Sequence, residues 1–469
     1  MLPRTSTATR LTIPNTKGLL VYDTISSTFW YNDGSAWQQI SNGSSALNGT
    51  TNYIAKFTGT STAGNSQIFD DGKYVGFGTT TPLARLHVVD SSVLFSAVGD
   101  IPSLVQNTPI SSAGRRMMWY ADKVAFRAGY AASTEFDSVN IGKYSVGLGY
   151  GSIAKGIYSA AIGHANSATG VAAFSGGESS AANGDYSFVF GQNCNAENPY
   201  AFSQGNHADA GGNYSIAMGN NTSAGGNYSF VRGVNSNTTG SNSLVLGVNL
   251  FDGGHKGNAM LGDTDPWNAG SVGSGSDDQM ICRFNNGYYF LTGGNTNRTG
   301  MLANHGDNSW SQISDSTKKE KIIPVDGEDL LHKIANFKLG TWNYKGQDPT
   351  IFRHYGPMAQ DFHHAFGHDA LGTIGNDTLI NQADFLGVRF TAIQALEKRT
   401  ERIEHQQSEI SALQKQNALL AEKNEILTQK NDKLQAQLES LLNSVSALDK
   451  KVQSLASLPV NTAGSLVNK

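Results

Sequence analysis

Residues 144–157 read YSVGLGYGSIAKGI, and this fourteen-residue pattern recurs without a break to residue 255. The eight blocks begin YSVGLG, YSAAIG, AAFSGG, YSFVFG, YAFSQG, YSIAMG, YSFVRG and NSLVLG. All eight have glycine at the sixth position, and seven have a second glycine at the thirteenth, Asn198 being the exception. Alternation such as YSFVFG predicts a short strand, and the glycines predict two corners where φ is positive or backbones approach closely. Two strands per block predict a β-solenoid, which is stable only as an array.

The repeats are also poor in charge. The eight blocks hold only seven charged residues: Lys155, Glu178, Asp185, Glu197, Asp209, Arg232 and Asp252. Such a surface predicts partial burial by neighbouring copies. The block pattern Y-S-x-A-x-G-x-x-[ST]-x-A-x-G resembles the head repeat of trimeric autotransporter adhesins. The resemblance covers roughly residues 130–255 and implies a left-handed parallel β-roll, with three chains side by side.

Residues 1–129 are predicted to form N-terminal β modules. The segment 19–40, LLVYDTISSTFWYNDGSAWQQI, predicts a β-hairpin with an Asn-Asp-Gly turn. Residues 53–89, which contain GFGTTTP and LHV, resemble short β modules of phage and bacterial tail-fibre-like proteins. GFGTTTP lacks the lysine of a phosphate loop and a helix pattern after it, so no nucleotide site is predicted.

Composition narrows the class of protein. The 469 residues carry a net charge of −4 and no strongly basic block, so no nucleic-acid partner is expected. Cys194 and Cys282 match no metal-ligand or disulfide spacing and are interpreted as packing residues. No apolar run is long enough to span a membrane, and the N-terminus lacks the apolar core of a signal peptide. We therefore expect either release by another route, such as phage lysis, or a truncated gene start.

The segment DNSWSQISDSTKKEKI, residues 307–322, places Ser314 and Lys319 five residues apart. A serine hydroxyl becomes a nucleophile when a base takes its proton, and a lysine can be that base where burial favours its neutral form. Alternatively, Thr317 and Glu320 form a capping box at the start of a polar helix. The spacing alone favours this second interpretation.

Two downstream segments favour the Ser–Lys pair over the capping box: HYGPMAQDFHHAFG, residues 354–367, and LINQADFLGVRFTAIQAL, residues 379–396. With the serine segment they resemble the intramolecular chaperone auto-processing domain of endosialidases, phage tail spikes and the myelin regulatory factor family. The matching positions are Ser314-Asp315, Lys319, Ile322, Gly356, Ala359-Gln360, Asp384, Gly387-Val388 and Ala392–Leu396. Lys318 departs from the pattern, since an aliphatic residue is usual there.

The resemblance implies a single cut in cis, at the Ile313–Ser314 bond. Ser314 attacks the carbonyl of Ile313, Lys319 is the general base, and an ester forms that water then releases. Asp315 is expected to fix the turn, and Gln360 is carried over as a supporting residue. No cofactor and no external substrate are predicted. His354, His363, His364 and His368 with Asp361 raise the question of a metal, but polar surface residues explain them equally well and no metal site is predicted.

A seven-residue register runs from Leu396 to Leu455 and predicts a coiled coil. One seam holds Leu396, Ile403, Ile410, Asn417, Asn424, Asn431, Leu438, Val445 and Val452. The other holds Arg399, Gln406, Leu413, Leu420, Leu427, Leu434, Leu441, Leu448 and Leu455. Asparagine at three core positions fixes register but often favours two strands. The repeats and the chaperone resemblance both imply three strands, which we expect here. Pro459 ends the helix.

Together these patterns predict a mainly β chain with an α-helical C-terminus: a trimeric β-roll, a small α+β chaperone domain and a coiled coil. The expected parts are 1–129, β modules; 130–255, β-roll; 256–313, β connector; 314–396, chaperone; 397–458, coiled coil; and 459–469, flexible tail. The expected function is a homotrimeric surface or virion fibre or adhesin precursor whose chaperone trimerises the chain and is then cut away. A host-surface glycan or protein is the candidate external partner. A tail-spike-like fibre with glycan hydrolase activity is the alternative, although no paired carboxylates support it.

Overall fold

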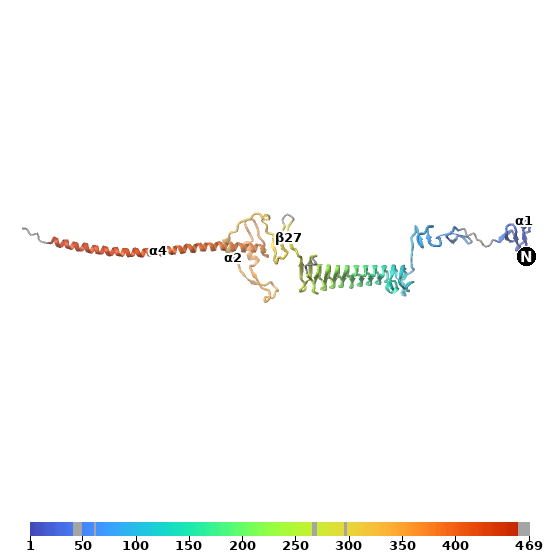
Figure 1. Ribbon diagram of the computed structural model, residues 1–469, viewed down its shortest axis with the longest axis horizontal. Helices are drawn as coiled ribbons and strands as arrows, with labels where there is room; N and C mark the ends of the chain where they lie inside the picture. Colours follow the sequence, from blue (N-terminus) through green and yellow to red (C-terminus); the bar gives the residue numbers. More distant parts are fainter. Residues whose placement is uncertain (41–48, 61, 265–269, 295–297, 458–469) are drawn as a thin grey trace, which may run out of the picture. The chain divides into compact units, whose positions relative to one another are not determined.

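The computed structural model describes residues 1–40, 49–60, 62–264, 270–294 and 298–457 (Figure 1). The chain divides into two compact units, Met1–Asn285 and Asn286–Lys469, and each is described by itself. In the described part, no helix is both long and apolar enough to span a membrane.

The first sheet is formed by β1 (Arg4–Thr5), β2 (Leu20–Asp23), β3 (Thr28–Asn32) and β4 (Trp37–Ile40), with α1 (Thr7–Thr12) beside it. Strands β3 and β4 pair antiparallel across the Asn-Asp-Gly turn, which confirms the predicted hairpin. A second sheet contains β5 (Tyr53–Phe57), β6 (Ala63–Asp70), β7 (Val75–Phe77) and β8 (Leu86–Val88).

A buried ion pair joins α1 to the first sheet. The Arg10 guanidinium lies 3.0 Å from the Asp23 carboxylate and 3.7 Å from the centre of the Trp30 ring. Burial favours the neutral acid, but hydrogen bonds from Ser26, Thr7, Arg10 and Ile25 outweigh it and hold the pKa of Asp23 well below its usual range. The small sheet therefore encloses a charged centre that is fully paired.

The predicted β-solenoid is confirmed: successive turns pair parallel, with a register of fourteen residues from Val146↔Ala160 to Phe230↔Leu244. Its strands are β11 (Val146–Tyr150), β12 (Ile153–Ala154), β13 (Ala160–His164), β14 (Ser167–Ala168), β15 (Phe174–Glu178), β16 (Ala181–Ala182), β17 (Phe188–Gln192), β18 (Asn195–Ala196), β19 (Phe202–Ala210), β20 (Ile216–Ala224), β21 (Phe230–Thr238), β22 (Leu244–Val248) and β23 (Leu250–Phe251).

The ladder extends beyond both ends of residues 130–255. It starts with β9 (Gly114–Tyr120) and β10 (Ala125–Ala131), and continues through β24 (Ala259–Gly262), β25 (Val272–Gly273) and β26 (Met280–Arg283). The 3-10 turns η1 (Ala121–Lys123) and η2 (Ser138–Asn140) lie near its start. These outer turns break the fourteen-residue period: Phe126 pairs with Val146, Leu244 with Ala259, and Ala259 with Met280. A search for a fixed period could not have found them.

The corners differ from the prediction. The sixth-position glycines have the predicted positive φ, but the residues with φ near 60° are at the first and eighth positions of each block, such as Tyr158 (φ 63°) and Ala165 (φ 54°), and are mostly not glycine. The sixth-position glycines lie inside the strands instead. Gly205 has φ 135°, and a Cβ there would lie 1.9 Å from the carbonyl oxygen of Gly219 in the next turn. These glycines allow adjacent turns to stack closely rather than making the corners.

The core of the array is built from small side chains at the second, fourth, ninth and eleventh positions, which are buried almost without exception. Second-position serines satisfy their hydroxyl groups locally: Ser187 Oγ donates to the Gly184 carbonyl at 2.6 Å. Cys194 is buried at a ninth position, and its thiol donates to the Gly205 carbonyl. Cys282 lies half-buried in β26.

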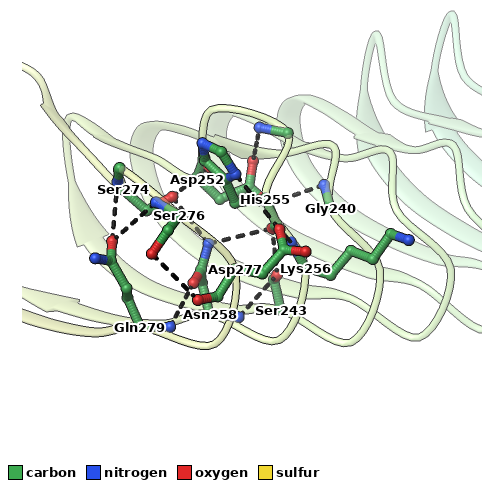
Figure 2. Close-up of polar contacts among 12 residues, drawn as sticks. Gly240, Ser243, Asp252, His255, Lys256, Asn258, Ser274, Ser276, Asp277 and Gln279 are labelled. Atoms are coloured by element: carbon green, nitrogen blue, oxygen red, sulfur yellow. Dashed lines mark hydrogen bonds and ion pairs between the residues drawn. The ribbon is translucent and has the colours of Figure 1, made fainter. Parts of the chain in front are cut away.

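Figure 2 shows how the regular array ends. Asp252 occupies an eleventh position where six of the seven earlier blocks have alanine, and it is completely buried. Its carboxylate accepts hydrogen bonds from the backbone N–H groups of Thr239, Gly240 and Gly254 at 3.0, 2.8 and 3.0 Å. The Thr238 hydroxyl donates to it as well. A buried carboxylate is tolerated because backbone donors surround it.

The second unit begins with an antiparallel sheet of β27 (Gly287–Thr292), β28 (Thr299–Asn304) and β29 (Ser311–Gln312). Next come η3 (Ser316–Lys318), α2 (Gly327–Ala335), β30 (Gly340–Trp342), β31 (His354–Gly356) and α3 (Ala359–Phe366). The last element is α4 (Gln382–Ala456). Among the described residues of this second unit, the buried apolar ones are Leu330, Phe362, Ala392 and Ala395.

Helix α4 contains the whole predicted register and confirms a continuous helix (Figure 1). Its pairing with other helices stays a prediction. Glu328, in the first turn of α2, accepts hydrogen bonds from Arg399 and Arg402. Arg399, a predicted seam residue, is therefore engaged within its own chain. Pro459 and the tail 459–469 lie outside the described residues.

Candidate active site

The predicted scissile bond lies where a strand gives way to a turn. Strand β29 pairs with β28 through Met301↔Gln312 and Leu302↔Ser311. The Ile313 N–H then donates to the Gly300 carbonyl at 3.2 Å. The chain is thus held in a sheet up to the residue just before Ser314.

Asp315 fixes the other side of that bond. Its carboxylate accepts the Thr317 N–H at 2.9 Å, and its carbonyl accepts the Lys318 N–H at 3.1 Å. Hydrogen bonds from the backbone and side chain of Thr317, with the nearby Lys318 charge, hold the pKa of Asp315 below its usual value. Asp315 is the N-cap of the short turn η3.

The turn brings the predicted nucleophile and base together. Lys319 Nζ lies 2.6 Å from Ser314 Oγ, in the hydrogen-bonding range. Both side chains are exposed in the single chain. With the ammonium as donor, the hydrogen bond runs from lysine to serine; proton abstraction requires the reverse, a neutral amine that accepts from the hydroxyl.

The capping-box interpretation is wrong, because no α-helix starts here. The chain makes one 3-10 turn over Ser316–Lys318 and leaves it at Lys319. The next helix is α2, with Asp326 as its own N-cap. Lys318, which departs from the usual pattern, donates from Nζ to the Arg298 carbonyl at 3.1 Å. Lys318 thus links the turn to the residue just before β28.

The downstream motif residues gather elsewhere. Asp384, Gly387 and Val388 of α4 line a groove of about 490 Å³, together with Phe362 of α3 and Val325. Gln360 lies in the first turn of α3, is exposed, and makes no hydrogen bond to the dyad in the described part of the chain. Gly356 ends β31 with φ 148°. These motif residues build the helical body rather than the reacting pair.

The histidines do not converge. His354 packs against Trp342, with ring centres 4.7 Å apart, whereas His363 lies against His368. Among the described residues, no group of three or more His, Cys, Asp or Glu side chains is placed to hold a metal ion.

Three segments of the chain match family models. Residues 314–369 match the chaperone of endosialidase, a peptidase family, and the match begins at Ser314 itself. Residues 1–55 match a phage tail-like trimerisation region, and residues 141–166 and 210–230 match the YadA head domain repeat. This is a trimeric fibre or adhesin with a C-terminal chaperone. No curated protein sequence matches the chain significantly.

The matches define several properties. The fibre is a homotrimer, its chaperone is of a self-cleaving peptidase type, and its parts are those of virion tails or cell surfaces. Nothing in the matches supports the glycan hydrolase alternative.

The sequence interpretation missed the trimerisation region at residues 1–55. Strand β3 carried a signal, because Phe29, Trp30 and Tyr31 place aromatic side chains on both of its faces. Phe29 and Tyr31 are each 42 % exposed in the single chain. A strand with one solvated face does not need aromatic residues on both sides.

Proposed function

We propose that this fibre precursor cuts itself once between Ile313 and Ser314, with Ser314 as nucleophile and Lys319 as general base. The observation that carries the proposal is the 2.6 Å contact between Lys319 Nζ and Ser314 Oγ. The peptidase-family match that starts at Ser314 supports it.

In the proposed reaction, the neutral Lys319 amine takes the hydroxyl proton while Ser314 Oγ forms a bond to the Ile313 carbonyl carbon. The C–N bond of that peptide then breaks, and the nitrogen, which receives a proton, becomes the new amino terminus. This leaves an ester between Ile313 and Ser314 Oγ. Water hydrolyses the ester, so the products are an Ile313 carboxylate and a free Ser314 hydroxyl.

The backbone on both sides of the bond is restrained, which favours an intramolecular step. The β28–β29 ladder holds Ile313, and the Asp315-capped turn holds Ser314 and Lys319. What the single chain lacks is burial of the pair. Because burial favours a neutral amine, we propose that assembly of three chains covers this turn and starts the reaction.

The test is expression of the full chain and sequencing of its products. We expect fragments 1–313 and 314–469, the smaller one beginning at Ser314. Ser314→Ala should lower the cleavage rate at least about a thousand-fold, whereas Ser316→Ala, a serine of the same turn, should cut normally. Cleavage of Ser314→Ala at the same bond would overturn the mechanism.

Lys319→Ala should also stop cleavage, with Lys321→Ala as the charge-matched control. Above the concentration at which trimers form, the rate should not depend on protein concentration; below it, the rate should fall. An uncleaved wild-type trimer would contradict the self-cleavage proposal and leave the domain as a trimeriser.

We further propose that the array presents its seventh-position side chains to a host-surface glycan or protein. Three of these residues form a hydrogen-bonded polar row in the middle of the array: Gln192 Nε2 donates to Glu178 at 2.9 Å, and Asn206 Nδ2 to Gln192 at 2.6 Å. The last two blocks have Val234 and Val248 at this position. The exposed tyrosines are less suited to sugar stacking, since Tyr200 and Tyr214 stack on each other at 4.7 Å. If Gln192→Ala leaves adsorption to host cells unchanged, this surface is not the contact.

A further inference from the structure

One side of the array carries a stripe of apolar side chains at the third and fifth positions. Because side chains alternate along a strand, these positions point away from the core when the fourth position points into it. The third positions hold Val146, Ala160, Phe174, Phe188, Phe202, Ile216, Phe230 and Leu244. The fifth hold Leu148, Ile162, Gly176, Phe190, Gln204, Met218, Arg232 and Leu246. We call these positions the apolar stripe.

The apolar stripe is incompletely covered in one chain. Phe188 is 38 % exposed and Phe190 51 %, although Val189 between them is completely buried. In the homotrimer, an extended apolar face of this kind is the surface that the other two copies cover. The stripe therefore marks the face that each chain turns toward its partners.

Arg232 lies inside this stripe. Its neighbours in the ladder are Met218 on one side and Leu246 on the other. In the described part of the chain its guanidinium makes no hydrogen bond or ion pair, and it lines a hollow of about 480 Å³ together with Met218 and Val248. A charge that assembly covers needs compensation, or its burial costs several kcal/mol.

The repeats on either side of Arg232 contain no acidic residue that could pair with it. Between residues 210 and 251, Arg232 is the only charged residue, and there is no aspartate or glutamate. In a closed cyclic trimer each residue lies at the same level in all three chains, so the three copies of Arg232 share one level. The nearest acidic repeat residues, Asp209 and Asp252, are roughly 7 to 8 Å away along the stack.

Neither of these carboxylates is suited to reach Arg232. Asp252 is completely buried and surrounded by its own backbone donors. Asp209 lies at a tenth position, in the second strand segment of its turn, outside the stripe. Asp263 directly precedes Thr264, which lines the same hollow, but its carboxylate is already paired with the Arg283 guanidinium at 3.1 Å. With these three carboxylates engaged or outside the stripe, the compensating charge comes from solution.

We propose that the three Arg232 side chains of the trimer bind one small oxyanion, phosphate or sulfate, between the chains. The planar guanidinium donates in a fork that matches two oxygens of such an anion. A tetrahedral oxyanion viewed along one of its bonds has threefold symmetry, so it can accept equivalent bonds from three chains. The bound anion offsets the repulsion among the three guanidinium groups and links the three chains.

The test is calorimetric titration of the purified full-chain trimer, with Ser314→Ala in every chain so that it stays uncleaved, with inorganic phosphate and separately with sulfate, in chloride buffer of constant ionic strength. We expect saturable binding of one anion per three chains and a higher melting temperature with the anion. Arg232→Met should abolish both effects. Lys155→Met, which removes an exposed cation elsewhere in the array, should leave them unchanged.

Arg232→Lys keeps the charge but loses the fork, so it should weaken binding at least about tenfold. No saturable binding by the trimer that retains Arg232, or unchanged binding by Arg232→Met, would overturn the proposal. If Arg232→Met fails to assemble, the stoichiometry of the trimer that retains Arg232 decides, since three anions per trimer would contradict a shared site.

Discussion

The array and helix α4 both pair their backbone groups, but they differ in how far one chain buries its apolar side chains. In the array, backbone groups pair with the next turn of the same chain, and core residues such as Val189 and Val231 are completely buried. In α4 the backbone is equally well paired, but the apolar seam residues from Ile410 to Leu455 are 47 % to 65 % exposed. One chain thus completes the core of the array, whereas the seam residues of α4 from Ile410 on are left uncovered in one chain. The difference predicts which mutations act within a chain and which act only through assembly.

The largest expected effect is a steric one within the array. At Gly212 a Cβ would lie 2.1 Å from the Gly226 carbonyl oxygen, whereas at the adjacent Gly211 the nearest atom is 3.6 Å away. We expect Gly212→Ala to cost about 3 kcal/mol or more of unfolding free energy, and Gly211→Ala less than about 0.5 kcal/mol. Thermal melts of both variants measure this. Equal melting temperatures would mean that the turns do not stack this closely.

The second prediction tests whether the helix obtains its core from other chains. Leu434 is 60 % exposed in one chain. If three helices pack along the seams, Leu434→Ala should destabilise the trimer by about 2 kcal/mol per chain or more, and the loss should depend on protein concentration. Gln435→Ala, off the seams, is the control. If the two variants melt alike, α4 does not associate through these seams.

A gain in stability is expected where the seam is polar. Asn424→Ile replaces a core amide with an apolar side chain, so the helical region should become more stable by about 1 kcal/mol per chain. It should also lose some control over the number of strands, which native mass spectrometry would detect as additional assemblies. A lower melting temperature for this variant would show that the register is misassigned.

The smallest expected effect concerns acid and the first sheet. The pKa of Asp23 lies below its usual range in the folded chain, so its carboxylate contributes stability that is complete above the unfolded value of about 3.9. That contribution is lost as the pH falls through the lower folded pKa. Hydrogen exchange in β2 and β3 should therefore accelerate in this acid range, while β20, which has no acidic residue, stays protected. Asp23→Asn should accelerate exchange already at neutral pH; protection unchanged by this substitution would contradict the role of the ion pair.

Two features followed from the sequence alone because each repeats at a fixed spacing. Glycine every fourteen residues predicted the solenoid, since stacked turns need the same close approach at each level. The heptads from Leu396 to Leu455 predicted a long helix. The five-residue spacing of Ser314 and Lys319 alone favoured a capping box. The pair, whose side-chain atoms lie 2.6 Å apart, was named from the resemblance carried by the downstream motifs.

Tertiary structure decided what no local pattern encodes. The array reaches from Gly114 to Arg283. The sequence repeats did not indicate its outer turns, because these turns pair in irregular registers. Its corners fall on residues such as Tyr158, whose left-handed backbone is imposed by the stacking of turns rather than by its own preference. Arg399, assigned to a seam by its spacing, is held by Glu328, 71 residues earlier in the chain. Spacing along the chain specifies which residues share a face of an element; only folding specifies what that face meets.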